Sequence, residues 1–343
     1  MEIKSITNTK EIRILFLAQY APKNLKEKIP AGIIDPCYAK YHHRIYFWLK
    51  NFFNYVQSES DVDILFDQFQ MEKIDYIFSL YNRIPFRNSE IFVSSLAEYY
   101  KKPYLGATPN IRALAEDKHL GKMLANSLGI KTPNWKIYDK GDKPVSPGFP
   151  GPYIIKPRFG ATSNFITEQS ICVDWQEAKQ KLVELIPDNE SVILEELIEG
   201  ATYTMPVLSN FKNPVFLPSI RETSNLKYNI ITKEHKRKIK SGLKRVVNEN
   251  NIIEKKLMAA SNIIFKNIQP LDYTRIDYMV SNKTQEIYFL EFNVCCNLGE
   301  QSSIIQSAQS KGILYDNLIG NILFSSMFRQ GLISKINFKI DNF

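Results

Sequence analysis

Apolar runs alternate with amphipathic stretches in the first part of the chain. Short apolar runs, which predict buried strands, occur at 12–18, 63–66 and 76–81. Helical spacing of apolar residues occurs at 38–53 and 91–100. Because strands that alternate with helices are typical of a parallel α/β layer, we predict an N-terminal α/β domain over residues 1–110.

The pattern changes in the middle of the chain. Four apolar residues share one face of a helix that begins near Asp117: Leu120, Met123, Leu124 and Leu128. Gly129 is a typical residue at the end of such a helix. Strands at 153–157 and 191–196 flank a second amphipathic helix at 174–186. We predict that residues 111–196 form a small α+β lid.

The last part of the chain is predicted to be a third domain, over residues 197–343. It contains a strand at 202–208, an irregular segment at 219–245, a buried helix at 252–268 and a closing helix at 313–328. Between the two helices, residues 273–277 and 286–293 have the pattern of a strand hairpin.

Polar side chains gather at the end of this hairpin. Glu291 and Asn293 are two residues apart, so they share one strand face, and Asp277 lies on the partner strand. Three oxygen ligands without thiolate or imidazole suit Mg²⁺. Arg275 lies on the same face as Asp277 and can meet an anion beside the metal. An ordinary buried strand pair with a polar end has the same local pattern, so this assignment depends on the rest of the chain.

Composition narrows the class of protein. Hydrophobic residues make up 44% and charged residues 23%, as in soluble globular proteins. No apolar run reaches the roughly 18 residues of a membrane span. The N-terminal segment lacks the apolar core of a signal peptide, and the four cysteines have no metal or disulfide spacing, so we expect a cytoplasmic protein.

The net charge of +8 is compatible with nucleic acid or with a pocket for a polyphosphate. Seven Lys and Arg residues lie within 233–245, without interleaved aromatic residues. No nucleic-acid motif accompanies them, so we expect neither nucleic acid nor a membrane as a partner.

Five motifs follow one another in a fixed order. They are Lys118, a Lys156-Pro157 strand with a turn of small residues, Glu195-Glu196-Leu197-Ile198, Arg275-Ile276-Asp277 and Glu291-Phe292-Asn293. This order and spacing resemble the ATP-grasp superfamily, and within it the D-alanine–D-alanine ligase branch. The resemblance implies an ATP-grasp fold, with a Rossmann-like N-terminal domain, a central lid and a metal-bearing C-terminal domain. The resemblance covers about residues 103–304.

The resemblance assigns ATP-binding roles to a further set of residues. Lys118 and Lys156 match lysines that hold phosphates, and Lys233 matches a loop lysine at the γ-phosphate. Thr162 and Ser163 match the small loop over the β- and γ-phosphates. The segment that contacts the edge of adenine is matched by Glu195, Glu196 and Ile198. Glu196 and Ile198 are expected to act through their backbone groups. A solvated surface lysine is an equally good interpretation of Lys118 alone.

The resemblance also assigns the chemistry. Asp277, Glu291 and Asn293 match the ligands of Mg²⁺, expected as two ions for which Mn²⁺ can substitute. Arg275 matches the arginine that stabilises the oxyanion when an amine attacks an acyl phosphate. Ser163 and Lys233 complete the catalytic set that we expect, with Lys233 closing over the γ-phosphate to exclude water.

The substrate pockets depart from the pattern of the branch. Thr202 stands where the branch has the Glu that contacts ribose, so this contact is absent or comes from another residue such as Glu199. The loop at 19–24 has no equivalent of the Glu that takes the first substrate's amine.

Cys295 and Cys296 are better interpreted as small hydrophobes in a tight turn than as a thiol site.

Other residues are candidates for substrate binding. Arg83 or Arg87 can bind a substrate carboxylate or cap a helix. Gly299 with Ser302 or Ser303 stands where the branch has the turn and serine for the second substrate's carboxylate.

We therefore predict an ATP-dependent carboxylate–amine ligase. It would join small amino-acid-like substrates through an acyl phosphate and release ADP and phosphate, in a specialised biosynthetic pathway. One alternative is a D-alanine–D-alanine ligase proper, and another is a ligase that adds amino acids to a protein or peptide acceptor. A regulatory ATP-binding module without turnover is disfavoured by the full set of metal ligands and by Arg275. A homodimer is compatible with the resemblance.

Overall fold

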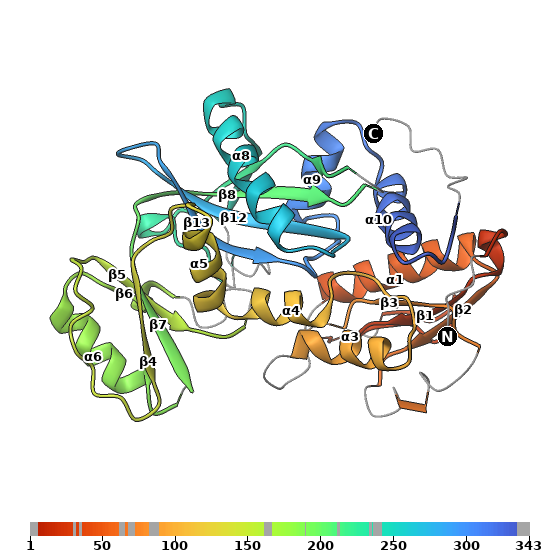
Figure 1. The fold of residues 1–343 in the computed structure, drawn as a ribbon, viewed down its shortest axis with the longest axis horizontal. Helices are drawn as coiled ribbons and strands as arrows, with labels where there is room; N and C mark the ends of the chain where they lie inside the picture. Colours follow the sequence, from red (N-terminus) through yellow and green to blue (C-terminus); the bar gives the residue numbers. More distant parts are fainter. Residues whose placement is uncertain are drawn as a thin grey trace.

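The strands that the structure describes form three sheets (Figure 1). The computed structural model describes residues 6–29, 32–33, 36–61, 66–67, 73–81, 89–160, 167–188, 190–210, 213–232, 235 and 242–334. The strand expected at 63–66 falls mostly outside these residues. No helix in the described ranges is long and apolar enough to cross a membrane.

The first sheet has three parallel strands in the order β2-β1-β3. Its elements are β1 (Arg13–Leu17), α1 (Pro36–Phe52), β2 (Tyr55–Glu59), β3 (Tyr76–Ser79) and α3 (Ser89–Tyr99). The expected α/β layer is confirmed. Strand β2 was not predicted because, of its five residues, only Val56 is buried and its other positions are polar or exposed.

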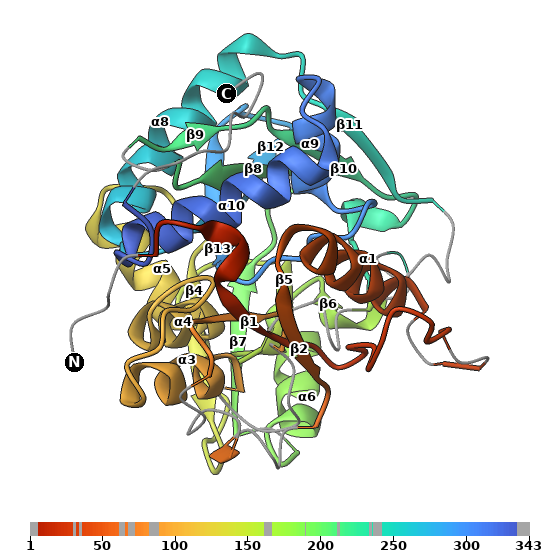
Figure 2. The same ribbon diagram turned by 90° about the vertical axis from the view of Figure 1, so that its right-hand side faces the viewer.

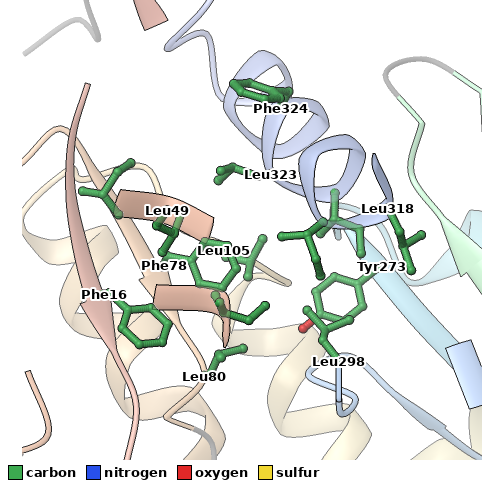
Figure 3. Packing of buried hydrophobic residues seen from close by; sticks show 14 of the residues in the cluster. Phe16, Leu49, Phe78, Leu80, Leu105, Tyr273, Leu298, Leu318, Leu323 and Phe324 are labelled. Carbon is green, nitrogen blue, oxygen red and sulfur yellow. The ribbon is translucent and has the colours of Figure 1, made fainter. Parts of the chain in front are cut away.

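The core of this sheet is shared with the end of the chain. Helix α10 (Tyr315–Arg329) confirms the expected closing helix. It lies between the N-terminal unit, which is the first sheet with α1 and α3, and the six-stranded sheet described below (Figures 1 and 2). Its Phe324 ring is 5.1 Å from that of Phe52, and the Tyr76 hydroxyl donates to Ser326 Oγ at 2.7 Å. Figure 3 shows this common packing. Helix α10 belongs to the third predicted domain but packs in the core of the first sheet. The domain boundary at residue 110 therefore stays a prediction.

The second sheet is antiparallel, in the order β4-β7-β5-β6. Its strands are β4 (Trp135–Asp139), β5 (Tyr153–Pro157), β6 (Ile171–Cys172) and β7 (Ser191–Glu196). Helix α6 (Trp175–Leu185) buries Ala178 and Leu182 against it. The strands and helix expected here are confirmed.

Helices α4 (Pro109–Glu116) and α5 (Lys118–Ser127) link the first two sheets. The Asp117 side chain caps α5 by accepting from two backbone N–H groups. The expected apolar face of this helix is wrong in part: Leu120 and Met123 are 41% and 49% exposed, whereas Lys122 is fully buried. The reason is that the Lys122 ammonium has a carboxylate partner in the interior, described below.

The third sheet is antiparallel, in the order β11-β10-β8-β12-β13, with β9 paired to β8. Its strands are β8 (Gly200–Leu208), β9 (Val215–Phe216), β10 (Ile220–Thr223), β11 (Lys244–Val247), β12 (Tyr273–Ser281) and β13 (Ile287–Asn293). Helices α8 (Asn251–Asn267) and α9 (Ser303–Ser310) pack on it. The hairpin is confirmed as β12 and β13.

Two details of this sheet bear on the site. The expectation of an irregular segment at 219–245 is wrong at both ends, because β10 and β11 add strands there. At the start of β8, a Cβ on Gly200 would lie 1.9 Å from the Val280 carbonyl oxygen. Only glycine therefore allows the β8 and β12 backbones to approach so closely.

Candidate active site

A cavity of about 210 Å³ lies between the second and third sheets. Lys118 and Lys156 line it from α5 and β5, and Asp277 and Glu291 line it from β12 and β13. Residues 228–231 border it as well. The cavity therefore brings together residues that are far apart in the sequence.

The four polar residues at the end of the hairpin lie side by side. In the β12–β13 ladder, Arg275 faces Asn293 and Asp277 faces Glu291. Asn293 Nδ2 is 3.2 Å from Asp277 Oδ2 and 3.5 Å from Glu291 Oε1. The Thr204 hydroxyl donates to Asp277 Oδ1 at 2.7 Å, which fixes that carboxylate from the neighbouring strand β8.

This group of side chains fits a hard divalent cation. Two carboxylates and one amide supply oxygen donors of the kind that Mg²⁺ binds, and a half-turn of the Asn293 amide exchanges its nitrogen and oxygen. Within the described residues, no three His, Cys, Asp or Glu side chains are grouped to hold a metal. A cation here would therefore need Asn293, phosphate oxygens or water as further ligands.

Arg275 extends the group toward an anion. Its Nη2 atom is 3.3 Å from Asp277 Oδ2, and its buried Nε atom has no hydrogen-bond partner among the described residues. Burial acts to lower the pKa of Arg275, but the surrounding acidic groups, Asp277 foremost, together outweigh this and hold the pKa above its ordinary value. The guanidinium is thus permanently charged and retains a free donor.

A second polar group lies on the opposite wall. Glu195 is 1% exposed, and its Oε1 atom is 3.0 Å from Lys156 Nζ while Oε2 is 3.4 Å from Lys122 Nζ. Lys122 also donates to Thr132 Oγ1 at 2.9 Å. Lys118 Nζ donates to the Gly160 carbonyl at 2.5 Å. We call Lys118, Lys122, Lys156 and Glu195 the lysine cluster.

The lysine cluster carries a surplus of positive charge. Burial lowers the pKa of both Lys118 and Lys122 to about 8, although Glu195 and Glu291 act in the opposite direction. Burial acts to raise the pKa of Glu195, but Lys122 and Lys156 outweigh it and the pKa is lowered. With one carboxylate among three lysines, the cluster is suited to phosphate groups.

Lys122, which supports the site from behind through Glu195, was missed by the sequence reasoning. It stands among leucines and a methionine on a helix whose apolar face alone was considered. One signal was present, because Lys118 and Lys122 are four residues apart and so lie on the same helix face.

The family described as "D-ala D-ala ligase C-terminus" matches residues 124–324, more than half of the 343 residues. The chain belongs to the D-alanine–D-alanine ligase family. The D-alanine–D-alanine ligase of Aquifex aeolicus is 29% identical over 239 residues, covering 67% of this chain and 76% of the relative. That of Carboxydothermus hydrogenoformans is 25% identical over 288 residues, covering 80% and 88%.

Solved structures of the family share the fold. The D-alanine–D-alanine ligase from Bacillus anthracis complexed with ATP superposes with a TM-score of 0.70 at 19% identity, covering 93% of this chain and 98% of that one. The VanG D-Ala:D-Ser ligase from Enterococcus faecalis gives 0.62 at 18% identity, covering 75% and 74%. The expected ATP-grasp fold is thereby confirmed.

The resemblance implies that Thr202 replaces a Glu that contacts ribose, and the structure places two other carboxylates relative to the cavity. Thr202 lines the cavity, whereas Glu199 is exposed and is not among the lining residues. Glu222, the register partner of Thr202 on β10, lines the cavity and is 6% exposed. Arg245 Nε donates to Glu222 Oε1 at 2.6 Å. Glu222 was missed because β10 was not predicted.

The linker between β7 and β8, which the family resemblance assigns to adenine, also lines the cavity. The backbone N–H of Glu196 donates to the Asn134 carbonyl at 2.8 Å, and Asn134 Nδ2 donates to the Glu196 carboxylate at 2.8 Å. The Glu196 backbone therefore has its carbonyl, not its N–H, to offer a ligand. Ile198 lines the cavity two residues later.

The candidate substrate residues of the family pattern lie apart from this cavity. Ser302 caps α9 by accepting from the Ile305 N–H, and Ser303 Oγ is buried without a partner among the described residues. Gly299 packs against α1. Burial raises the pKa of the Cys296 thiol to about 12, which supports its interpretation as a small hydrophobe. Other predicted residues lie outside the described ranges: Arg83, Arg87, Thr162, Ser163 and Lys233.

Proposed function

We propose that this protein is an ATP-dependent ligase that forms an amide bond between two small amino-acid-like substrates. The observation that carries the proposal is one cavity lined by Lys118, Lys156 and Glu195 on one side and by Arg275, Asp277 and Glu291 on the other. Lys122 and Asn293 lie directly behind this lining, against Glu195 and Asp277 respectively. The curated relatives named above are D-alanine–D-alanine ligases, which supports the same class of reaction.

The first step is transfer of a phosphoryl group. A substrate carboxylate oxygen attacks the γ-phosphorus of ATP, the bond from that phosphorus to the bridging oxygen breaks, and ADP leaves. Lys118 and Lys156 hold the phosphates, and Glu195 orients the Lys156 ammonium. Asp277, Glu291 and Asn293 would hold Mg²⁺, as two ions that Mn²⁺ can replace, to neutralise the charge on the phosphates.

The second step forms the amide. The amine nitrogen of the second substrate attacks the acyl carbon, the carbon–oxygen bond to phosphate breaks, and the proton that the nitrogen loses passes to the departing phosphate. Arg275 stabilises the negative charge on the acyl oxygen during this attack, because its guanidinium is charged and its Nε donor has no partner among the residues that the structure describes. We propose a biosynthetic product other than D-alanyl-D-alanine, since the loop at 19–24 lacks the Glu that takes the first substrate's amine in the family pattern.

The test is ADP release by the purified protein with Mg-ATP over pairs of amino acids of both hands, with products identified by mass. We expect turnover that requires two amino acids and a product lighter than their sum by one water. D-Alanyl-D-alanine as the strongly preferred product would contradict the specialised pathway and favour a D-alanine–D-alanine ligase proper. ATP binding without turnover for any pair would favour a larger peptide acceptor.

We also expect the affinity for ATP to fall as the pH rises through about 8, the pKa of Lys118 and Lys122. Below this pH both ammonium groups are charged before ATP arrives. Above it, binding must first restore a proton, which weakens binding by up to about tenfold per pH unit for each lysine. Calorimetry in buffers of different ionisation enthalpy should detect proton uptake above pH 8, and its absence would contradict the assignment.

A further inference from the structure

The loop of residues 297–301 directly follows the strand that carries Glu291 and Asn293. It begins four residues after Asn293, so it lies within about 14 Å of that residue along the chain. The Gly299 N–H donates to Asn297 Oδ1 at 2.6 Å, and the Ser302 N–H donates to the Gly299 carbonyl at 2.9 Å. The loop therefore has a defined turn structure of its own.

Helix α1 of the N-terminal unit holds one side of this loop. A Cβ on Gly299 would lie 3.3 Å from Tyr41 Cβ, so the loop backbone lies against the helix. One turn further along α1, the Arg44 guanidinium pairs with the Glu300 carboxylate. The same guanidinium lies 3.7 Å from the centroid of the Tyr315 ring on α10. Arg44 thus joins three segments.

Strand β11 holds the other side. Arg245 Nη1 donates to the Gln301 carbonyl at 3.0 Å. Its Nε donates to Glu222, which lines the cavity between the second and third sheets; we call this the nucleotide cavity. Consecutive loop residues, Glu300 and Gln301, are thus held by arginines from two different elements, α1 and β11.

The base of the loop is fixed in the core. Leu298 is fully buried, and its carbonyl accepts from the Tyr315 hydroxyl at 3.0 Å. Figure 3 shows the Leu298 side chain beside Tyr273, the first residue of β12. The apolar base is therefore fixed without the arginines, which act only on the polar tip of the loop at residues 300–301.

We infer that Arg44 and Arg245 are positioning residues that hold the tip of the 297–301 loop as a wall of the pocket for the amine substrate. The inference rests on the proposed function. Arg275 faces Asn293 at the end of β13, so an amine that attacks the acyl group beside Arg275 approaches next to the segment that continues β13. Because Arg245 also binds Glu222, it couples this wall to the nucleotide cavity, whereas Arg44 does not.

The Arg44–Glu300 pair is suited to a clean test because it is exposed. The Arg44 side chain is 39% exposed and that of Glu300 62%, and such exposed pairs contribute little to stability. The Arg13–Asp75 pair of the same N-terminal unit is a matched control, since the Arg13 side chain is 40% exposed and lies on β1.

We expect Arg44→Gln to raise KM for the amine substrate about tenfold, with KM for ATP and thermal stability unchanged. The ratio of ADP to amide should also rise, because water intercepts an acyl phosphate when the amine is badly held. The charge-reversed pair Arg44→Glu with Glu300→Arg should recover part of the loss, and Arg13→Gln should behave as wild type. Arg245→Gln should raise KM for both ATP and the amine.

Amide hydrogen exchange provides a readout that does not need turnover. In Arg44→Gln, the Gly299 and Ser302 amides should exchange faster than in wild type and in Arg13→Gln. Unchanged exchange, or faster exchange with an unchanged KM for the amine, would overturn the inference. A wild-type protein that forms no amide would instead contradict the proposed function, while the exchange data would still decide whether the arginines hold the loop.

Discussion

Replacing Glu291 by Gln should lower kcat by about a thousandfold and leave the fold intact. The change keeps the size of the side chain but removes one negative charge from the group that faces Asp277 in the ladder. Charge stabilisation by a bound cation contributes several kcal/mol to phosphoryl transfer, and about 4 kcal/mol corresponds to a thousandfold in rate. The Mg²⁺ concentration needed for half-maximal activity should rise as well.

The measurement is kcat as a function of Mg²⁺ concentration. Glu286→Gln is the matched control, because Glu286 lies immediately before β13 and pairs with Lys131 at the surface. Its variant should keep both kcat and the Mg²⁺ requirement. Near-normal kcat in Glu291→Gln would remove Glu291 from the proposed ligand set.

Replacing Glu195 by Leu should destabilise the protein by about 3–5 kcal/mol at pH 7, because it leaves the buried ammonium of Lys122 without its carboxylate. The loss of the carboxylate also lowers the pKa of Lys122 further below about 8, so this lysine becomes neutral near pH 7. ATP affinity should therefore fall together with stability.

The double variant Glu195→Leu with Lys122→Met separates the two effects. It exchanges the buried ion pair for apolar side chains and should recover much of the stability, but not the affinity for ATP. Urea unfolding and calorimetry with ATP measure the two quantities. A single variant as stable as wild type would show that the lysine cluster does not depend on its carboxylate.

The candidate site was predictable where the local pattern matched the final contacts. The hairpin is visible in the sequence because apolar positions alternate toward Asp277 in its first strand and form a run that ends at Asn293 in its second. The two strands pair with each other and are close in the chain. The pattern does not reveal the irregularity between Asp277 and Tyr278, where the register with β13 shifts. That shift depends on packing between strands rather than on residue type.

The residues that were missed depend on distant partners. Lys122 is buried only because Glu195, from a different strand, neutralises it. Glu222 lies on a strand of four residues that also contains Arg221, so the segment resembles a polar loop until β8 and β11 pair with it. In both cases the decisive interaction joins segments that no local window contains.

The core that α10 shares with the first sheet has a consequence for folding during synthesis. Tyr76 and Ser326, which are hydrogen-bonded, are 250 positions apart in the chain. The first strands emerge from the ribosome long before α10, so the cluster that contains Phe16 and Phe78 lacks its α10 members, among them Phe324, until residues beyond 315 have been made. Such distant contacts slow folding and prolong the exposure of apolar surface. The core of the N-terminal unit is therefore completed only after α10 has been made, even though the strands of this unit are made first.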